Sequence, residues 1–219
     1  MIQSKKIVTD DETRPGPLKA DTTWGKVKDI RPYSYFKGIQ LKNKNVGIVG
    51  YGSIGRKVAH ILGKGFGMNV LIFDPYVSRM DIDEPGFKKV DFETLVRESD
   101  FITCHTKITE SVRNMFNKET FAKMKPTAFF INNSRGAIVN EADLIEALRT
   151  HQIAGAALDV YEYEPLYAGH PFVNGELNNV ITTPHISGAA VDAITNHTQM
   201  FVEEIIHFIN NEPLIYQYK

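Results

Sequence analysis

Three short polar segments carry the residue types needed for acid–base chemistry beside a bound carboxylate. They are Asn133–Gly136, Asp159–Pro165 and Pro184–Gly188. The arginine of the first segment, Arg135, can bind a carboxylate through two parallel hydrogen bonds and polarise a neighbouring carbonyl. The histidine of the third, His185, can transfer a hydroxyl proton near neutral pH, and a carboxylate behind its ring favours the charged form. By residue chemistry alone, Glu162 and Glu164 are equal candidates for that carboxylate.

A further motif has the spacing of a phosphate-binding turn. Directly after a short apolar run the chain reads Gly50-Tyr51-Gly52-Ser53-Ile54-Gly55. Gly50 permits a sharp turn, Gly52 lets the backbone approach a pyrophosphate, and Gly55 lets the following helix pack closely on the strand. The backbone amides at the start of that helix, Ser53 and Ile54 among them, would face the negative charge. This arrangement predicts a dinucleotide site.

The cofactor is indicated by Asp74, which follows the apolar run Asn69–Phe73 at the distance from Gly55 expected of a ribose-binding acid. A carboxylate there can accept hydrogen bonds from the ribose hydroxyls and would repel a 2′-phosphate. The sequence therefore predicts NAD rather than NADP. Arg79, which lies close to Asp74 in sequence, slightly favours NADP.

The elements that must position these residues follow from alternating patterns along the chain. Strands are expected at Val46–Gly50, Asn69–Asp74, Asp100–His105, Ala128–Asn132, Ile153–Val160 and Asn179–Thr183. Helices are expected from Ile54 to Leu62 and after the start signals Asp91, Asn117 and Asn140, the last with Asp143 three residues on. The fold class is therefore α/β: a Rossmann-type, doubly wound parallel sheet with helices on both faces. Ligands bind beyond the carboxyl ends of such strands.

We expect three parts in the chain: an N-terminal arm or linker remnant (residues 1–40), a NAD-binding Rossmann domain (41–188), and a C-terminal helix and tail (189–219). The arm has no sustained helical or strand period. The C-terminal helix, about Ala189 to Asn210, has one apolar face that includes Phe201, Ile205 and Phe208. We interpret that face as a packing or docking surface.

Taken together, four ordered motifs resemble the D-isomer-specific 2-hydroxyacid dehydrogenases, with phosphoglycerate-dehydrogenase-like members nearest. They are Gly50–Gly55, Asn133–Gly136, Leu158–Pro165 and Thr183–Gly188, and the resemblance runs from about Phe36 to Asn210. It implies that Arg135 binds the substrate and that Glu164, rather than Glu162, pairs with His185 in a proton relay. It also implies a NAD-dependent interconversion of a small D-2-hydroxy acid and its 2-keto acid.

The same resemblance places Asp159 beside the nicotinamide and His105 and Thr106 along the cofactor cleft. Gly188, at the end of the last motif, is also expected to bind the cofactor. From residue type alone, Asp159 could also cap or brace a loop, and His105 equally suits strand-end packing. The connection Gly63–Gly67 is one residue longer than is usual in the family, which predicts an altered turn there.

The resemblance also implies a preceding substrate domain, whereas only an arm stands before Val46. We therefore expect a fragment of a longer protein or a shortened relative, and from these 219 residues by themselves NADH binding without measurable turnover. Two other functions stay open. One is a regulatory module whose partner binding responds to NAD(H), since fold alone does not decide function. The other is an inactive truncated relative.

Bulk composition sets further limits. The chain has 25 Lys and Arg against 26 Asp and Glu, a formal net charge of −1, which predicts no nucleic-acid or membrane partner. Its apolar runs are too short to span a bilayer. The single cysteine, Cys104, fits a reducing compartment, so we expect a cytoplasmic protein. The histidine, cysteine and acidic residues do not have the spacing of a metal site, so we expect no metal. A homodimer is expected because the family pairs through its cofactor domain.

Overall fold

The computed structural model describes residues 38–82 and 84–216. The chain forms two compact units, Met1–Pro184 and His185–Lys219. Nearly all of the expected N-terminal arm, residues 1–37, lies outside the described residues.

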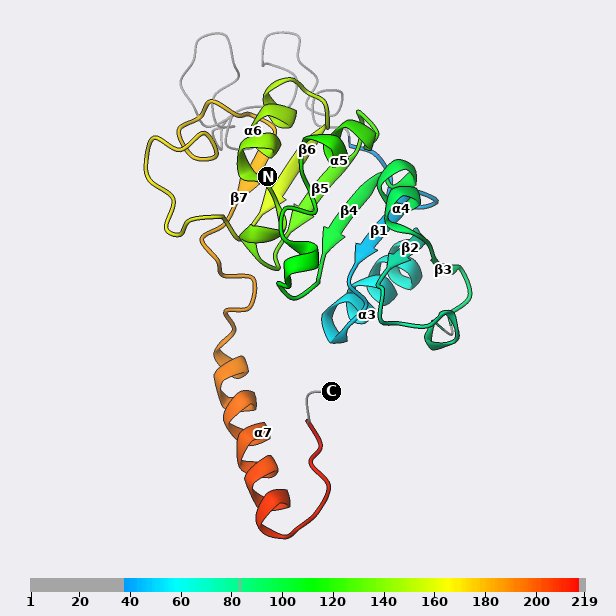
Figure 1. Ribbon diagram of the computed structural model, residues 1–219, viewed down its shortest axis with the longest axis vertical. Helices are drawn as coiled ribbons and strands as arrows, with labels where there is room; N and C mark the ends of the chain where they lie inside the picture. Colours follow the sequence, from blue (N-terminus) through cyan, green and yellow to red (C-terminus); the bar gives the residue numbers. More distant parts are fainter. Residues whose placement is uncertain (1–37, 83, 217–219) are drawn as a thin grey trace, which may run out of the picture. The chain divides into compact units, whose positions relative to one another are not determined.

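The first unit is built on a seven-stranded sheet in which every neighbouring pair of strands is parallel (Figure 1). The strands are β1 (Asn45–Val49), β2 (Asn69–Phe73), β3 (Phe87–Lys89), β4 (Phe101–Cys104), β5 (Phe129–Asn132), β6 (Gly155–Leu158) and β7 (Val180–Thr182). Their order is β3-β2-β1-β4-β5-β6-β7, so the winding reverses between β1 and β4. This confirms the doubly wound sheet. The edge strand β3 was not predicted, and most of the other strands are shorter than predicted.

The described part of the first unit has four α-helices, and the last three begin where side-chain caps predicted them. They are α3 (Ser53–His60), α4 (Phe92–Glu98), α5 (Lys118–Lys123) and α6 (Glu141–Arg149), with short 3-10 turns at Arg79–Asp81, Glu110–Val112 and Gly136–Ile138. Asp91, Asn117 and Asn140 each accept a hydrogen bond from a backbone N–H in the first turn of the helix that follows. Asp143 does not complete a capping box, because its carboxylate accepts from the Lys118 N–H of α5 at 2.9 Å.

The connection after α3 is where the chain departs from a regular helix. An α-helix was expected as far as Leu62, but α3 ends at His60 and passes into a π-helical turn, η1 (Ile61–Gly65). A π turn holds one more residue than an α turn over the same advance. The altered connection predicted around Gly63–Gly67 therefore takes the form of a widened last turn.

The core lies on both faces of the sheet. On one face α3 packs over β1 and β2 with Val46, Ile48 and Val70 buried beneath it. On the other, α4, α5 and α6 cover a larger cluster centred on the rings of Phe116 and Phe130, whose centroids are 4.6 Å apart. Burying a phenylalanine contributes on the order of 1.5–3 kcal/mol. The two clusters fix the sheet and hence the positions of its strand ends.

The second unit consists of residues 185–190, α7 (Val191–Ile209) and the segment that follows it. The carboxylate of Glu204 accepts hydrogen bonds of 2.7 Å from the backbone N–H groups of Ile215 and Tyr216, which ties that segment to the helix. No residue of α7 is buried. Within the described residues, no helix is both long and apolar enough to cross a membrane.

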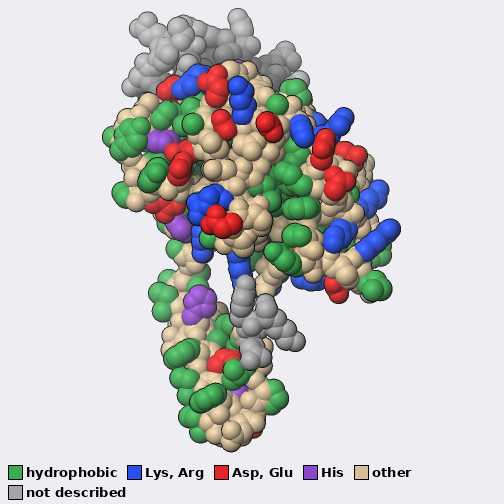
Figure 2. All heavy atoms as spheres, in the orientation of Figure 1, with side chains coloured by type: hydrophobic (Ala, Val, Ile, Leu, Met, Phe, Trp, Pro, Cys, Tyr) green, Lys and Arg blue, Asp and Glu red, His purple; other side chains and the backbone are tan. Residues whose placement is uncertain are grey.

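The surface of the first unit carries charges of both signs. Figure 2 shows Lys and Arg side chains interspersed with Asp and Glu on its visible face. Ion pairs on the surface of the first unit include Lys64 with Glu84 at 2.9 Å and Arg149 with Glu146 at 3.0 Å. Exposed pairs of this kind contribute about 0–1 kcal/mol each. They do not determine the fold.

Candidate cofactor and substrate site

The glycine turn after β1 lies against the residues that follow β4. Gly50 has φ +92°, and a Cβ on it would come within 2.8 Å of the His105 carbonyl and the Thr106 nitrogen. A Cβ on Gly55 would overlap the Gly50 carbonyl oxygen. Only glycine fits either position without displacing backbone. The turn is thereby fixed at the reversal between β1 and β4, where doubly wound sheets bind ligands.

The middle glycine of the turn has the opposite surroundings. A Cβ on Gly52 would meet nothing within 4 Å. Gly52 is also the N-cap of α3, where no side chain caps the helix and no acidic residue stands in the first turn. Ser53 and Ile54, the first residues of α3, are exposed. Open space in front of uncapped amides at the positive end of a helix suits the pyrophosphate of a dinucleotide.

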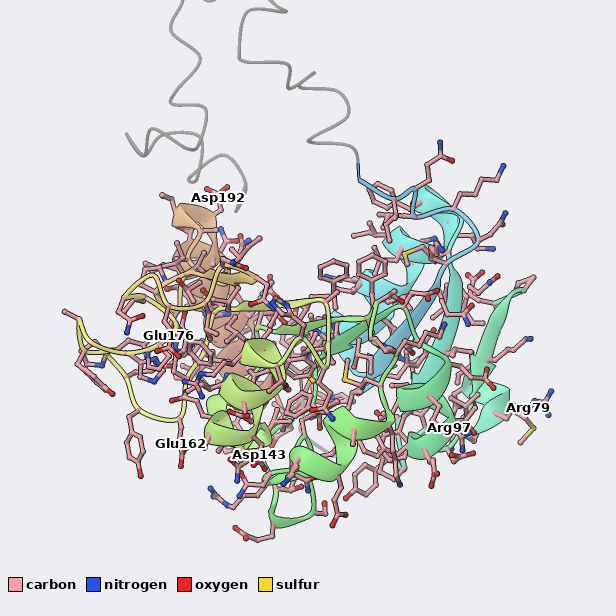
Figure 3. The ribbon with its side chains drawn as sticks, turned by 90° about the horizontal axis from the view of Figure 1, so that it is seen from above. Arg79, Arg97, Asp143, Glu162, Glu176 and Asp192 are labelled. Atoms are coloured by element: carbon pink, nitrogen blue, oxygen red, sulfur yellow. The ribbon has the colours of Figure 1, made fainter. Side chains whose placement is uncertain are left out.

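The Asp74 carboxylate is tied to this turn. One oxygen accepts a hydrogen bond from the Tyr51 N–H at 2.7 Å, and the other accepts from the Tyr76 N–H at 2.9 Å. The acid predicted from spacing therefore stands at the end of β2, beside the opening in front of Gly52. Arg79 is exposed and lies on the outer rim of the domain (Figure 3). The choice between NAD and NADP stays a prediction.

His105 and Thr106 continue β4 beyond its last strand residue. The His105 N–H donates to the Val49 carbonyl at 2.7 Å, and its ring Nε2 lies 3.0 Å from the Thr103 hydroxyl. Burial lowers the pKa of His105 from 6.5 to about 4, so the ring is neutral at neutral pH. The Thr106 carbonyl accepts a hydrogen bond from the Ser134 hydroxyl. This bond joins the end of β4 to the Arg135 segment.

The Arg135 segment is shaped by a buried amide. Asn132, the last residue of β5, accepts from the Ser134 N–H at 3.1 Å and donates to the Arg135 carbonyl at 3.0 Å. The Arg135 side chain is exposed, and its guanidinium donates to the Ser134 carbonyl at 2.7 Å. Asn132 was predicted only as a strand residue, because an amide at a strand end carries no signal of its turn-holding role.

The loop after β6 is anchored by Asp159, which is 4% exposed. Its N–H donates to the Asn132 carbonyl at 2.9 Å, and its carboxylate accepts from the Thr183 hydroxyl. This is the loop-bracing contact that residue type alone allowed. Asp159 directly follows the last residue of β6, and its place beside the nicotinamide stays a prediction.

Farther along this loop, Glu164 is held by Tyr161, whose N–H donates to the Glu164 carboxylate at 3.0 Å. The backbone of Tyr161 also abuts the Arg135 segment, since a Cβ on Gly136 would overlap the Tyr161 carbonyl. The Arg135 and Glu164 segments are therefore packed backbone to backbone. Glu162, the equal candidate by residue chemistry, is tied through its N–H to α6 instead, where the Glu141 carboxylate accepts at 3.1 Å.

An acid–histidine pair that was not predicted from sequence supports the same loop. The buried His170 ring accepts from the Phe172 N–H at 3.3 Å through Nδ1, so its Nε2 donates to Glu141, 2.9 Å away. Glu141 is the first residue of α6 and lies 29 positions away in sequence. No local pattern connects two residues so far apart.

His185 and Gly188 belong to the second unit, whereas Arg135 and Glu164 belong to the first. His185 has φ +53°, a left-handed backbone conformation uncommon outside glycine. Its pairing with Glu164 stays a prediction. Among the described residues, no group of three histidine, cysteine or acidic side chains could hold a metal ion.

This geometry defines a doubly wound dinucleotide-binding domain with polar groups gathered at its carboxyl edge. The family model for the D-isomer specific 2-hydroxyacid dehydrogenase, NAD binding domain, matches residues 18–187. The chain belongs to this family, as the motif resemblance predicted.

Individual proteins give the same result. A D-3-phosphoglycerate dehydrogenase of Archaeoglobus fulgidus is 40% identical over 82% of this chain, which corresponds to 33% of that protein. A glyoxylate reductase of Thermococcus litoralis is 41% identical over 81% of this chain and 52% of its own length. The NAD-complexed D-isomer specific 2-hydroxyacid dehydrogenase of Lactobacillus delbrueckii ssp. bulgaricus superposes with a TM-score of 0.76 at 26% identity, over 97% of this chain and 62% of that structure. The chain thus spans about a third to a half of the curated relatives.

The contrast between Gly52 and Gly55 makes the turn testable. Gly55→Ala forces a Cβ onto a carbonyl oxygen, so we expect a loss of unfolding free energy of about 1–3 kcal/mol or more. Gly52→Ala enters open space and changes only the helix N-cap, at a cost of at most about 1 kcal/mol. It should nevertheless weaken NADH binding at least about tenfold, because the methyl group occupies the pyrophosphate approach. Urea unfolding and fluorescence titration measure the two effects. Unchanged NADH affinity in Gly52→Ala would contradict this assignment.

Proposed function

We propose that this chain is the cofactor domain of a NAD-dependent oxidoreductase that interconverts a small D-2-hydroxy acid and its 2-keto acid, in the manner of phosphoglycerate dehydrogenases. The observation that carries the proposal is the junction at the carboxyl edge of the sheet. There the glycine turn packs on His105 and Thr106, and the Arg135 segment packs on the Glu164 loop through Gly136. The residues proposed to bind the cofactor and the substrate therefore come from neighbouring strand ends of the first unit, which supports the proposal.

In this proposal each residue has a defined task. When bound, NADH supplies the hydride that reduces the keto carbon. Arg135 binds the substrate carboxylate and polarises the carbonyl, for which its exposed guanidinium is suited. His185, charged and oriented by Glu164, gives its ring proton to the keto oxygen, and takes it back in the oxidation direction. Asp159, Thr106 and Gly188 would line the nicotinamide end, and the neutral His105 ring would contact it without adding charge.

We assign the preference for NAD over NADP to Asp74. Because its carboxylate is already fixed by two backbone N–H groups, it presents a stationary negative charge that a 2′-phosphate would meet. We expect NADH to bind at least about tenfold more tightly than NADPH, a difference of about 1.4 kcal/mol. Asp74→Ala should narrow the gap, mainly by improving NADPH binding. Equal affinities for the two cofactors in the unmutated chain, measured by fluorescence titration, would refute the assignment.

The relay is tested by turnover in the protein expressed from its complete gene, with hydroxypyruvate and glyoxylate among the 2-keto acids. His185→Ala should lower kcat by roughly 10²–10⁴-fold and leave NADH binding intact, because acid–base catalysis contributes about that much. Glu164→Gln should shift the pH–rate profile to lower pH, since the charge that favours the protonated imidazole is lost.

Glu162→Gln is the matched control, because it removes an acid of the same loop that the relay does not use. A shift of the pH–rate profile in Glu162→Gln but not in Glu164→Gln would exchange their roles. If the protein binds NADH yet reduces none of the acids offered, the enzyme proposal is wrong. A module that senses NAD(H) would then be favoured.

We also propose that the protein is a cytoplasmic homodimer. The buried thiol of Cys104 suits a reducing compartment, and α7 presents Ile194, Phe201 and Phe208 with more than half of each side chain exposed. A second copy would cover such a surface. Size-exclusion chromatography with light scattering should give twice the chain mass at micromolar concentrations. A single monomeric species over that range would count against the dimer.

A further inference from the structure

Tyr161 stands at the junction of three segments that the proposed reaction uses. Its ring is buried, and its hydroxyl lies 2.7 Å from the Thr183 carbonyl and 3.1 Å from the Leu158 carbonyl. A phenol has one proton to donate, so the shorter contact, to Thr183, is the principal bond. Burial raises the pKa of Tyr161 to about 12, which keeps the hydroxyl a donor throughout the neutral range.

The backbone of the same residue serves the other two segments. The Tyr161 N–H donates to the Glu164 carboxylate at 3.0 Å, and the Tyr161 carbonyl lies where a side chain on Gly136 would otherwise stand. One residue therefore contacts the Arg135 segment, the Glu164 carboxylate and the chain immediately before Pro184-His185. Thr183 also donates two hydrogen bonds, from its hydroxyl to the Asp159 carboxylate and from its N–H to the Leu158 carbonyl.

We propose that Tyr161 is a positioning residue for the acid–histidine pair: its hydroxyl fixes the carbonyl of Thr183, two residues before His185, while its N–H fixes Glu164. This inference rests on the proposed function, because it takes Glu164 and His185 as the relay. The hydrogen bond from Tyr161 holds the Thr183 carbonyl, and a rotation of that peptide would change the direction in which the chain continues to His185. Small errors in such placement are costly, since a displacement of about 1 Å can reduce a rate 10²-fold.

A purely packing role is the competing explanation, and it makes a different demand on the side chain. The Tyr161 ring packs against Phe172, with centroids 6.2 Å apart, and packing needs only the ring. Positioning of Thr183 needs the hydroxyl. Tyr161→Phe keeps the ring and removes the hydroxyl, so it separates the two roles while preserving the fold.

The test reads the His185 ring directly and needs no turnover. The 219-residue chain is labelled with ¹⁵N-histidine, and the ring nitrogen shifts, which report the tautomer and protonation state, are recorded across the neutral pH range. His185→Gln assigns the signals. Tyr167→Phe is the matched control, because Tyr167 belongs to the same loop, is 66% exposed and is outside the junction. NADH affinity is measured for each variant and should stay within about twofold, which is under about 0.5 kcal/mol.

We expect Glu164→Gln to change the His185 ring shifts, Tyr161→Phe to change them in the same direction, and Tyr167→Phe to leave them as in the unmutated chain. In the protein expressed from its complete gene, Tyr161→Phe should lower kcat about tenfold with the KM for NADH unchanged. His185 signals that are identical in Tyr161→Phe and the unmutated chain would overturn this inference alone. Signals that are unchanged in Glu164→Gln would overturn the relay, and this inference with it.

Discussion

The site depends on a backbone-to-backbone contact between Gly50 and the His105–Thr106 peptide. A Cβ on Gly50 would come within 2.8 Å of that peptide, so no side chain fits at this position. The contact closes the space between β1 and β4 at the point where the winding of the sheet reverses. Because the turn cannot move away from β4, α3 must begin where it does, with its uncapped amides beside the opening at Gly52. The hydrogen bond from Tyr51 to Asp74 then brings the end of β2 to the same place.

A close backbone contact at a glycine also occurs on the other half of the sheet. Gly136 lets the Arg135 segment touch the Tyr161 backbone, as Gly55 lets α3 touch the turn at Gly50. Close backbone contacts place polar groups more accurately than side-chain contacts could, because they remove rotamer freedom from the junction. Buried polar side chains complete the arrangement: Asn132 shapes one turn and Asp159 braces the next. The segment of the exposed Arg135 is thus shaped by a buried residue, Asn132.

Sequence patterns predicted those features that depend on local spacing. The glycine turn, the acid at Asp74 and the starts of α4, α5 and α6 all follow from residues within about twenty positions of one another. Features set by tertiary contact were missed or misread. The short edge strand Phe87–Lys89 has too few residues to show a period, and Asp143 bonds to a neighbouring helix instead of its own. The place of Tyr161 depends on Thr183, 22 positions away, so no local pattern shows it.

Hydrogen exchange of the 219-residue chain, with and without saturating NADH, tests the central claim most directly. If the dinucleotide binds at the reversal between β1 and β4, exchange should slow in peptides covering residues 50–56 and 104–107. Peptides from the middle of α5, away from the strand ends, should exchange as before. Protection of 50–56 together with 104–107 is the predicted result. Slowing that avoids both segments, or no slowing at concentrations well above the dissociation constant, would contradict binding at this place.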